Sequence, residues 1–134
     1  MEFAELREGD SVLGLLVDSI AVLPDPADGF GWMGSVDYSG VVPLTGEYRA
    51  HGDFPEVREV CFFADDSSAV RLPRFPNDVR RPWFCFTNQD RAVELLGEPG
   101  ATGRARVVID RYLYLYRHTD VYNRARLVRV EAKF

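Results

Sequence analysis

The segment from Arg104 to Arg117 alternates in side-chain character with a period of two over fourteen residues. One set of alternate positions holds Ala105, Val107, Ile109, Leu113 and Leu115, and the other holds Val108, Asp110, Tyr112, Tyr114 and Tyr116. Successive side chains of a β-strand point to opposite faces, so the pattern predicts a strand. Because a typical strand has about five or six residues, we expect this one to be bent or shared between two sheets.

Turn residues divide the rest of the chain into further short apolar segments. They predict strands over residues 12–22, 32–38, 41–49, 57–64, 69–75, 83–86 and 125–132. The first of these is a buried segment whose length also fits a short helix, although its residues favour a strand. Ser39-Gly40 predicts a two-residue hairpin between the second and third of these, and residues 65–68 predict another hairpin. In the last segment the apolar positions change phase, which indicates a β-bulge near Leu127-Val128.

The strongest helix signal spans residues 88–96. Thr87 is the expected N-cap, Asp90 stands at the capping-box position, and Gly97 follows the last apolar residue, where a helix commonly ends. We therefore expect one short α-helix near residues 88–96. No alternation of strands and helices accompanies it, so the strands should pair antiparallel. The chain is predicted to be mostly β, an antiparallel β-barrel or sandwich of about seven or eight strands.

Length and composition predict a single β-rich domain over residues 1–134. A chain of 134 residues, of which 46% are hydrophobic, buries about two-thirds of its unfolded surface, which is enough for one core. The acidic N-terminal segment lacks the apolar stretch of a signal peptide. The most apolar segment, residues 12–23, is too short and too polar to span a bilayer. We therefore expect a cytoplasmic protein without membrane contact.

Cys61 and Cys85 each stand inside an aromatic segment. A free cysteine in such surroundings is usually a small buried hydrophobe. A disulfide would fit a secreted protein better than a cytoplasmic one. We therefore expect two reduced thiols in the core.

The formal net charge of −5 conceals an uneven distribution. Residues 1–70 hold fourteen acidic residues and three arginines, a net charge of −11, whereas residues 71–134 hold thirteen basic and seven acidic residues, a net charge of +6. The two halves either neutralise each other across paired strands or form two surfaces of opposite sign. Mutual neutralisation is the expected outcome, because interleaved strands usually mix sequence halves.

No segment carries a complete catalytic or metal-binding motif. Residues 29–34 match G-x-G-x-x-G as a string, but they lack the preceding strand and following helix that a dinucleotide site requires. Ser11 has no base in a recognisable motif, because His51 and His118 each stand alone. Two isolated cysteines and two isolated histidines do not have the spacing of a zinc site. We therefore expect no catalytic residue, no metal and no cofactor.

The tyrosines of the alternating segment are the main candidates for a binding surface. Tyr112, Tyr114 and Tyr116 share a predicted face, with Arg111 and Arg124 nearby. Single-stranded nucleic acids stack on aromatic rings beside guanidinium groups, and tyrosine and arginine are also frequent at protein interfaces. In the alternative interpretation, the rings pack inside the protein with their hydroxyls at its rim.

A second basic cluster consists of Arg71, Arg74, Arg80 and Arg81, close to Trp83. Guanidinium groups suit phosphate or carboxylate partners, so Arg80, Arg81 and Trp83 are added to the candidate binding surface. Alternatively, these arginines pair with acidic turns of the same chain.

The acidic first half suggests a further surface, whose residues fall mostly in predicted turns and strand ends: Asp25, Asp28, Asp37, Glu47, Asp53, Glu56, Glu59, Asp65 and Asp66. A small acidic domain without catalytic residues can bind and neutralise a basic protein such as a nuclease or toxin. We therefore expect a non-enzymatic interaction protein whose partner is another protein. One alternative is a single-stranded nucleic-acid-binding β-barrel that uses the tyrosines and arginines. Another is a β-barrel with a small ligand inside, lined by Trp32, Phe62, Phe84 and Tyr114.

Overall fold

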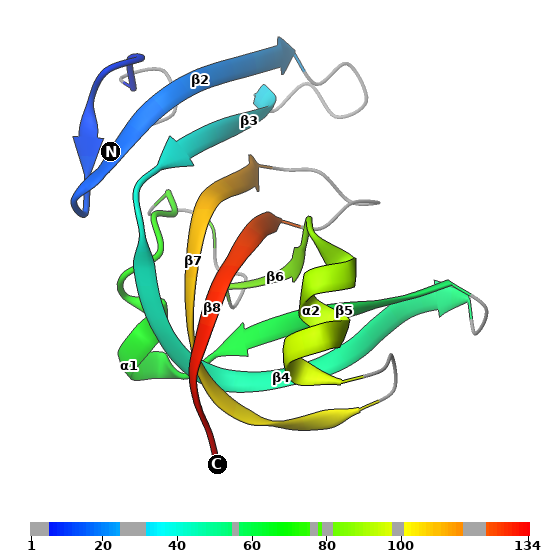
Figure 1. Ribbon diagram of the computed structural model, residues 1–134. Helices are drawn as coiled ribbons and strands as arrows, with labels where there is room; N and C mark the ends of the chain where they lie inside the picture. The colour runs from blue at the N-terminus through cyan, green and yellow to red at the C-terminus, as the bar shows by residue number, and fades with distance from the viewer. Residues whose placement is uncertain are drawn as a thin grey trace.

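Eight strands and two short helices make up the part of the chain that the computed structural model describes, residues 6–24, 32–54, 57–75, 78, 82–97, 101–116 and 123–134 (Figure 1). The elements are β1 Ser11–Val12, β2 Leu15–Pro24, β3 Trp32–Ser39, β4 Val42–Phe54, β5 Val57–Ala64, α1 Asp66–Ala69, β6 Trp83–Phe86, α2 Gln89–Leu96, β7 Thr102–Tyr116 and β8 Arg124–Lys133. The prediction of a mostly β chain is confirmed. The predicted ranges of β5 and β6 agree with the structure at both ends.

Hydrogen bonds join the strands into one sheet with the order β1-β2-β3-β7-β4-β5-β6-β8, and β8 also pairs with β7. The pairings therefore lead from β7 through β4, β5, β6 and β8 back to β7. Every pairing is antiparallel except that of β6 with β8, where Cys85 faces Arg124 in parallel register. The sheet is thus mixed, and the expectation of purely antiparallel pairing is corrected at this one contact.

The long strand β7 organises the sheet, and Figure 1 shows that it is strongly curved. Its C-terminal part pairs with β3 and its N-terminal part with β4, so these two strands follow one another along the same edge of β7. The predicted hairpin at Ser39-Gly40 is therefore wrong. Gly40 has a φ of 119°, and the chain continues past it in the same direction, because β7 offers pairing sites for both strands in succession.

A bulge in β7 changes which side chains face inward. Arg111 has a φ of 50°, and the register with β8 shifts between Asp110 and Leu113. After this shift Tyr112 and Tyr114 lie on the buried side together with Ile109, so the single uninterrupted alternation predicted for the strand is wrong beyond residue 110. The bulge predicted in β8 is confirmed, because Arg129 and Leu127 pair with consecutive residues of β7.

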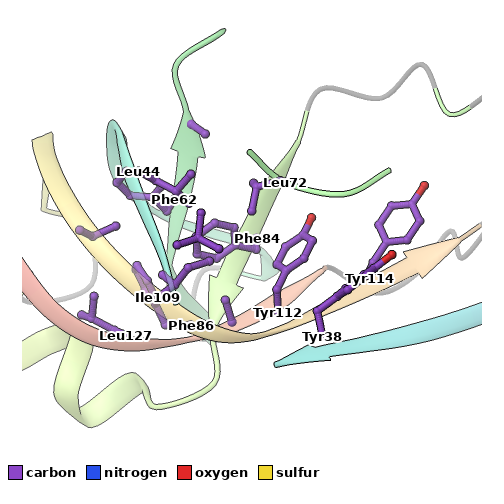
Figure 2. Close-up of a cluster of buried hydrophobic side chains, with 14 of the residues drawn as sticks. Tyr38, Leu44, Phe62, Leu72, Phe84, Phe86, Ile109, Tyr112, Tyr114 and Leu127 are labelled. Carbon is purple, nitrogen blue, oxygen red and sulfur yellow. The ribbon is translucent and has the colours of Figure 1, made fainter. Parts of the chain in front are cut away.

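The core lies inside the curve of these strands and is rich in aromatic rings (Figure 2). Phe84 is its centre, with ring centroids 5.8 Å from Phe62, 5.5 Å from Phe86 and 6.0 Å from Tyr112. Leu127 of β8 is also fully buried. Tilted and edge-to-face ring pairs add about 0.5–1.5 kcal/mol each beyond burial, so the centre is both dense and specific in shape.

Three further predicted elements differ from the structure: the hairpin at residues 65–68, the strand 69–75 and the strand 12–22. The expected hairpin at residues 65–68 is the start of α1, because the Asp65 carbonyl accepts hydrogen bonds from the amides of Ser68 and Ala69. The Ser68 hydroxyl in turn accepts a hydrogen bond from the Thr45 amide, and in the described residues from 69 to 75 there is no strand. The expected strand 12–22 contains a tight turn at Leu13-Gly14, where both residues have positive φ.

The predicted helix is confirmed as α2, with Gly97 ending it at a φ of 114°. Its N-cap residue is Asn88 rather than Thr87, and neither side chain caps the helix. The Asn88 amide instead exchanges two hydrogen bonds of 2.9 Å with the backbone of Leu127, which ties the helix to β8. Gln89 bonds to both backbone groups of Val60 and so ties it to β5. Among the described residues, neither helix has the length and apolar character needed to cross a membrane.

Candidate interaction surface

Tyr112 and Tyr114, the centre of the predicted tyrosine–arginine surface, are buried, each with 2% of its area exposed. The Tyr114 hydroxyl donates to Asp78 Oδ2 at 2.5 Å and accepts a hydrogen bond from the Phe75 amide at 3.3 Å. Its ring meets the Phe75 ring edge-on at 5.5 Å. The bulge at Arg111 turns both tyrosines inward, so their rings offer no exposed face on which a base could stack.

The Tyr112 ring also packs inside the protein. It stacks against Tyr38 of β3 with centroids 6.4 Å apart, and its hydroxyl accepts a hydrogen bond from Asn123 Nδ2. Burial raises the pKa of Tyr38 to about 12. These tyrosines therefore form the contact between β3, β6 and β7, which agrees with the structural interpretation of the pattern.

The other residues of the predicted surface are dispersed. Arg111 is exposed, whereas Arg124 is partly buried and donates two hydrogen bonds of 3.1 Å to Glu59 Oε1. Trp83 is half-buried and stacks on Phe63 at 5.2 Å. Arg80, Arg81 and the side chains of Tyr116 and Trp32 lie outside the described residues.

Most arginines of β7 and β8 that the structure describes have acidic partners. Arg126 binds Asp110 through two hydrogen bonds, Arg106 binds Glu131 at 3.2 Å, and Arg104 binds Asp65. The hydrogen bonds and the charge of these carboxylates raise the pKa of Arg104 and of Arg126. The Arg104–Asp65 and Arg124–Glu59 pairs join the two sequence halves, so the expected mutual neutralisation occurs at these contacts.

The outer side of β2 and β3 has a different charge pattern. Asp18 and Asp37 are exposed there, and their only hydrogen bonds in the described part of the chain come from the hydroxyls of Ser39 and Ser19. The register shifts between Val17 and Ser19, so Asp18 occupies the bulge. Neither carboxylate has a basic partner within the described ranges. We call Asp18, Ser19, Asp37 and Ser39 the acidic face.

The chain before β1 brings further acidic residues to this end of the sheet. The amide of Gly9 donates to the carbonyl of Val17 at 2.8 Å, and the amide of Val17 donates to the carbonyl of Asp10. This pairing brings exposed Glu8, which directly precedes Gly9, to the same end of the sheet as Asp18. Figure 1 shows β1, β2 and β3 together at the top of the view, with the C-terminus at the bottom.

Apolar side chains border the acidic face. Leu16, which lies between Leu15 and Val17 of the core and points outward, is 47% exposed, and Leu13 at the turn before β2 is 60% exposed. Leu13 also lines a hollow of about 690 Å³ together with Val70, Leu72 and Arg74. The β1–β2 hairpin thus carries the exposed carboxylate of Asp18 and two exposed leucines.

Sequence reasoning identified Asp37 but missed Asp18, because Asp18 interrupts an apolar segment that was assigned as buried throughout. Burial alternates along Leu15, Leu16 and Val17 in the structure, but all three residues are apolar, so the sequence carries no signal for the exposed positions. Of the other predicted acidic residues, Glu47, Glu59 and Asp65 have arginine partners. The side chains of Asp25, Asp28, Asp53 and Glu56 lie outside the described residues.

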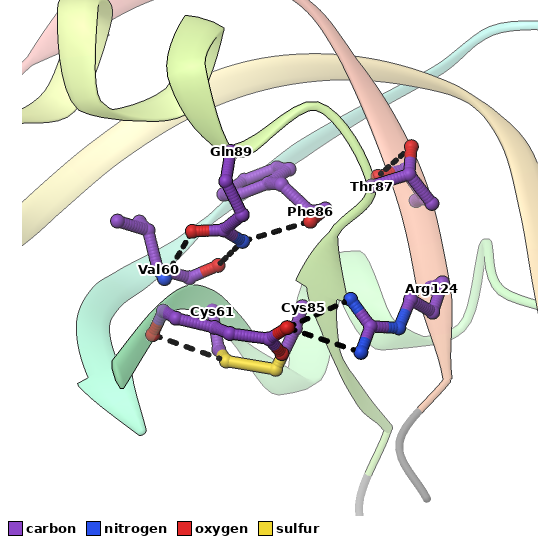
Figure 3. A network of polar contacts seen from close by, with 9 residues as sticks. Val60, Cys61, Cys85, Phe86, Thr87, Gln89 and Arg124 are labelled. Atoms are coloured by element: carbon purple, nitrogen blue, oxygen red, sulfur yellow. Dashed lines mark hydrogen bonds and ion pairs between the residues drawn. A yellow bond between two sulfur atoms is a disulfide. The ribbon is translucent and has the colours of Figure 1, made fainter. Parts of the chain in front are cut away.

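The expectation of reduced thiols is wrong in this structure, because Cys61 of β5 and Cys85 of β6 form a disulfide (Figure 3). The two residues face each other directly in the antiparallel ladder, with Cα atoms 3.8 Å apart. Their separation of 24 residues concealed this in the sequence, since only strand pairing brings them together. A disulfide fits a secreted protein better than a cytoplasmic one, so this pairing gives the expected cytoplasmic location no support.

Comparisons of the chain with protein-family models, with curated proteins and with solved structures find no match. The function is therefore argued from the geometry and charge of the chain itself.

Proposed function

We propose that the protein is a non-enzymatic interaction protein that binds a basic segment of another protein through the acidic face of β2 and β3. The observation that carries this proposal is the contrast in pairing. The described arginines of β7 and β8 are mostly bound to carboxylates, whereas Asp18 and Asp37 are exposed and have only hydroxyl partners among the described residues.

Charge complementarity accelerates association and excludes like-charged partners. Exposed Leu13 and Leu16 on the same hairpin supply apolar area, which the centre of a protein interface requires. A partner that combines arginine or lysine with apolar side chains therefore fits this surface. Such a partner agrees with the neutralising role expected from the acidic first half of the sequence.

We further propose that β4, β5, β6, β7 and β8 form a small closed barrel. The proposal is supported by the strand pairings, which lead from β7 through β4, β5, β6 and β8 back to β7. The interior of this barrel holds Phe62, Phe84 and Tyr114 in mutual contact with other rings, and this dense packing favours a surface function over a ligand held inside. Burial of Tyr112 and Tyr114 likewise favours a protein partner over stacked nucleic-acid bases.

The test measures binding of a fluorescent arginine-rich peptide by anisotropy at two salt concentrations. The variant Asp18→Asn/Asp37→Asn is compared with Asp90→Asn/Glu94→Gln, which removes the same charge from exposed positions of α2. Two exposed charge pairs contribute about 0.4–2 kcal/mol together, so the Kd should rise roughly two- to thirtyfold in the first variant. The α2 variant should bind like the wild type.

An equal rise of the peptide Kd in both double variants would show that net charge alone attracts the peptide. This result would contradict the assignment of the acidic face as the binding surface. A labelled single-stranded oligonucleotide is the second probe. Binding of the oligonucleotide with a steep salt dependence, in the absence of peptide binding, would favour the nucleic-acid alternative instead.

A further inference from the structure

Three potential metal ligands meet where β5 and β6 pair. One carboxylate oxygen of Glu59 and the sulfur atoms of Cys61 and Cys85 all lie within 4.8 Å of one another. Both cysteines are fully buried, and Glu59 is partly exposed at the edge of the cluster. Figure 3 shows the disulfide beside the carboxylate that Arg124 binds.

Glu59 has one oxygen that its surroundings do not satisfy. Both guanidinium bonds from Arg124 end on Oε1, whereas Oε2 is buried and accepts no hydrogen bond within the described residues. A buried carboxylate oxygen without a donor is unfavourable and calls for an explanation such as an ion. The carboxylate of Glu59 thus has a buried oxygen without a hydrogen-bond donor among the described residues, and one of its oxygens lies within 4.8 Å of both sulfur atoms.

We propose that reduction of the Cys61–Cys85 disulfide creates a Zn²⁺ site formed by the two cysteine thiolates and Glu59. Thiolate, imidazole and carboxylate are the ligands Zn²⁺ takes in proteins, and three protein ligands leave a fourth position for water. Two thiolates and one carboxylate carry three negative charges, which Zn²⁺ and Arg124 balance together. Arg124 would also orient the carboxylate, as residues around bound metals commonly do.

Strand geometry suits this assignment. Zn–S bonds of about 2.3 Å in a tetrahedral site place two sulfur atoms about 3.8 Å apart. Cys61 and Cys85 lie directly opposite one another in the β5–β6 ladder, so their sulfur atoms can take this separation once the S–S bond is broken. A Zn–O bond of about 2.1 Å requires the carboxylate oxygen to lie about 3.6 Å from each sulfur, a closure of roughly 1 Å at most that side-chain rotation can supply.

The redox step uses a dithiol reductant. Its thiolate attacks one cysteine sulfur, the S–S bond breaks, and a mixed disulfide forms. The second thiolate of the reductant then attacks the reductant's own sulfur in the mixed disulfide and displaces the remaining cysteine thiolate. The reductant leaves as an intramolecular disulfide, and the protein has gained two electrons and two protons. Zn²⁺ binding releases those two protons from the thiols.

The experiment uses the full chain, reduced with dithiothreitol, freed of reductant without air and titrated with Co²⁺ as a spectroscopic substitute for Zn²⁺. The expected result is one Co²⁺ per chain, with the thiolate-to-metal charge-transfer bands of a tetrahedral site. Added Zn²⁺ should remove these bands, and the oxidised protein should show none. Zn²⁺ should also raise the urea midpoint of the reduced protein but leave the oxidised protein unchanged.

Single substitutions test whether each proposed ligand contributes to metal binding. Glu59→Gln keeps a hydrogen-bond acceptor for Arg124 but removes the charge, and it should weaken Zn²⁺ binding about tenfold or more. Cys85→Ser should abolish the charge-transfer bands. Glu131→Gln is the matched control, because Glu131 also binds arginine on a strand, and it should bind Co²⁺ like the wild type.

Three results would overturn the proposal. The first is reduced wild-type protein that binds no Co²⁺ or Zn²⁺ more tightly than Cys85→Ser does. The second is equal affinity in Glu59→Gln and Glu131→Gln. The third is loss of the native circular-dichroism spectrum on reduction that Zn²⁺ does not restore, since a site on paired strands requires the fold.

Discussion

Replacement of Tyr114 by phenylalanine tests whether the tyrosines of β7 hold the protein together. The change removes one hydroxyl and keeps the ring, so apolar burial and the edge-on contact with Phe75 stay the same. It removes the hydrogen bond donated to Asp78 and the one accepted from the Phe75 amide.

The expected loss follows from these two bonds. A hydrogen bond to a charged group contributes about 1.5–3 kcal/mol net, and one between neutral groups contributes about 0.5–1.5 kcal/mol. Asp78 is partly exposed and water can replace part of its lost bond. We therefore expect the free energy of unfolding to fall by about 2 kcal/mol.

The assay is urea unfolding at pH 7, followed by intrinsic fluorescence, with the denaturant slope compared between variants. Tyr38→Phe is the matched control, because its ring is equally buried beside Tyr112 but its hydroxyl has no hydrogen-bond partner among the described residues. The free energy of unfolding of Tyr38→Phe should stay within about 0.5 kcal/mol of the wild-type value.

An unchanged unfolding free energy for Tyr114→Phe would refute the buried position of the hydroxyl. If the same variant also lost affinity for single-stranded oligonucleotides, the tyrosines would be a surface platform after all. The conclusion that the bulge at Arg111 turns Tyr112 and Tyr114 toward the core would then be wrong.

Three further perturbations test other parts of the structure. Burial raises the pKa of Tyr38 from 10.0 to about 12 in the folded protein. The stabilisation of the folded state by the neutral Tyr38 hydroxyl is therefore complete below pH 10 and is lost as the pH rises toward 12. Between pH 10 and 12 the free energy of unfolding of the wild type should fall by at most about 1.4 kcal/mol per pH unit more than that of Tyr38→Phe. Urea unfolding from pH 9 to 12 measures this difference, and parallel curves would contradict it. Gly46→Ala would place its Cβ 2.2 Å from the carbonyl oxygen of Phe63, which is backbone, so we expect a loss of about 2 kcal/mol or more in thermal unfolding. Replacing Cys61 and Cys85 by serine should cost about 3–4 kcal/mol from the loop they close, and the reduced, metal-free wild type should lose the same amount in urea unfolding.

Local elements were predictable because their signals lie within a few neighbouring residues. The β5 and β6 ranges follow from apolar segments bounded by turn residues, and α2 follows from its apolar spacing and from Gly97. The unusual length of β7 is also local, since it is read from one continuous alternation. Even the bulge in β8 has a local signal, the change of phase at Leu127-Val128.

The candidate site was predictable only in part. Asp37 could be assigned to an exposed acidic surface from its position, but which acidic residues stay without arginine depends on pairings across the sheet. Glu59 of β5 and Arg124 of β8 are 65 residues apart and form an ion pair because β6 pairs with β5 on one side and with β8 on the other. No pattern in either segment indicates this contact.

The sequence by itself determined a mostly β chain, the positions of most strands and one helix. Tertiary structure alone decided that β3 and β4 share one edge of β7, that Tyr112 and Tyr114 face the core, and that Cys61 meets Cys85. The physical reason is the range of the interactions. Strand formation depends on side chains two to four positions apart, whereas strand order, register and disulfide pairing depend on the free energy that distant segments gain only when they are brought together.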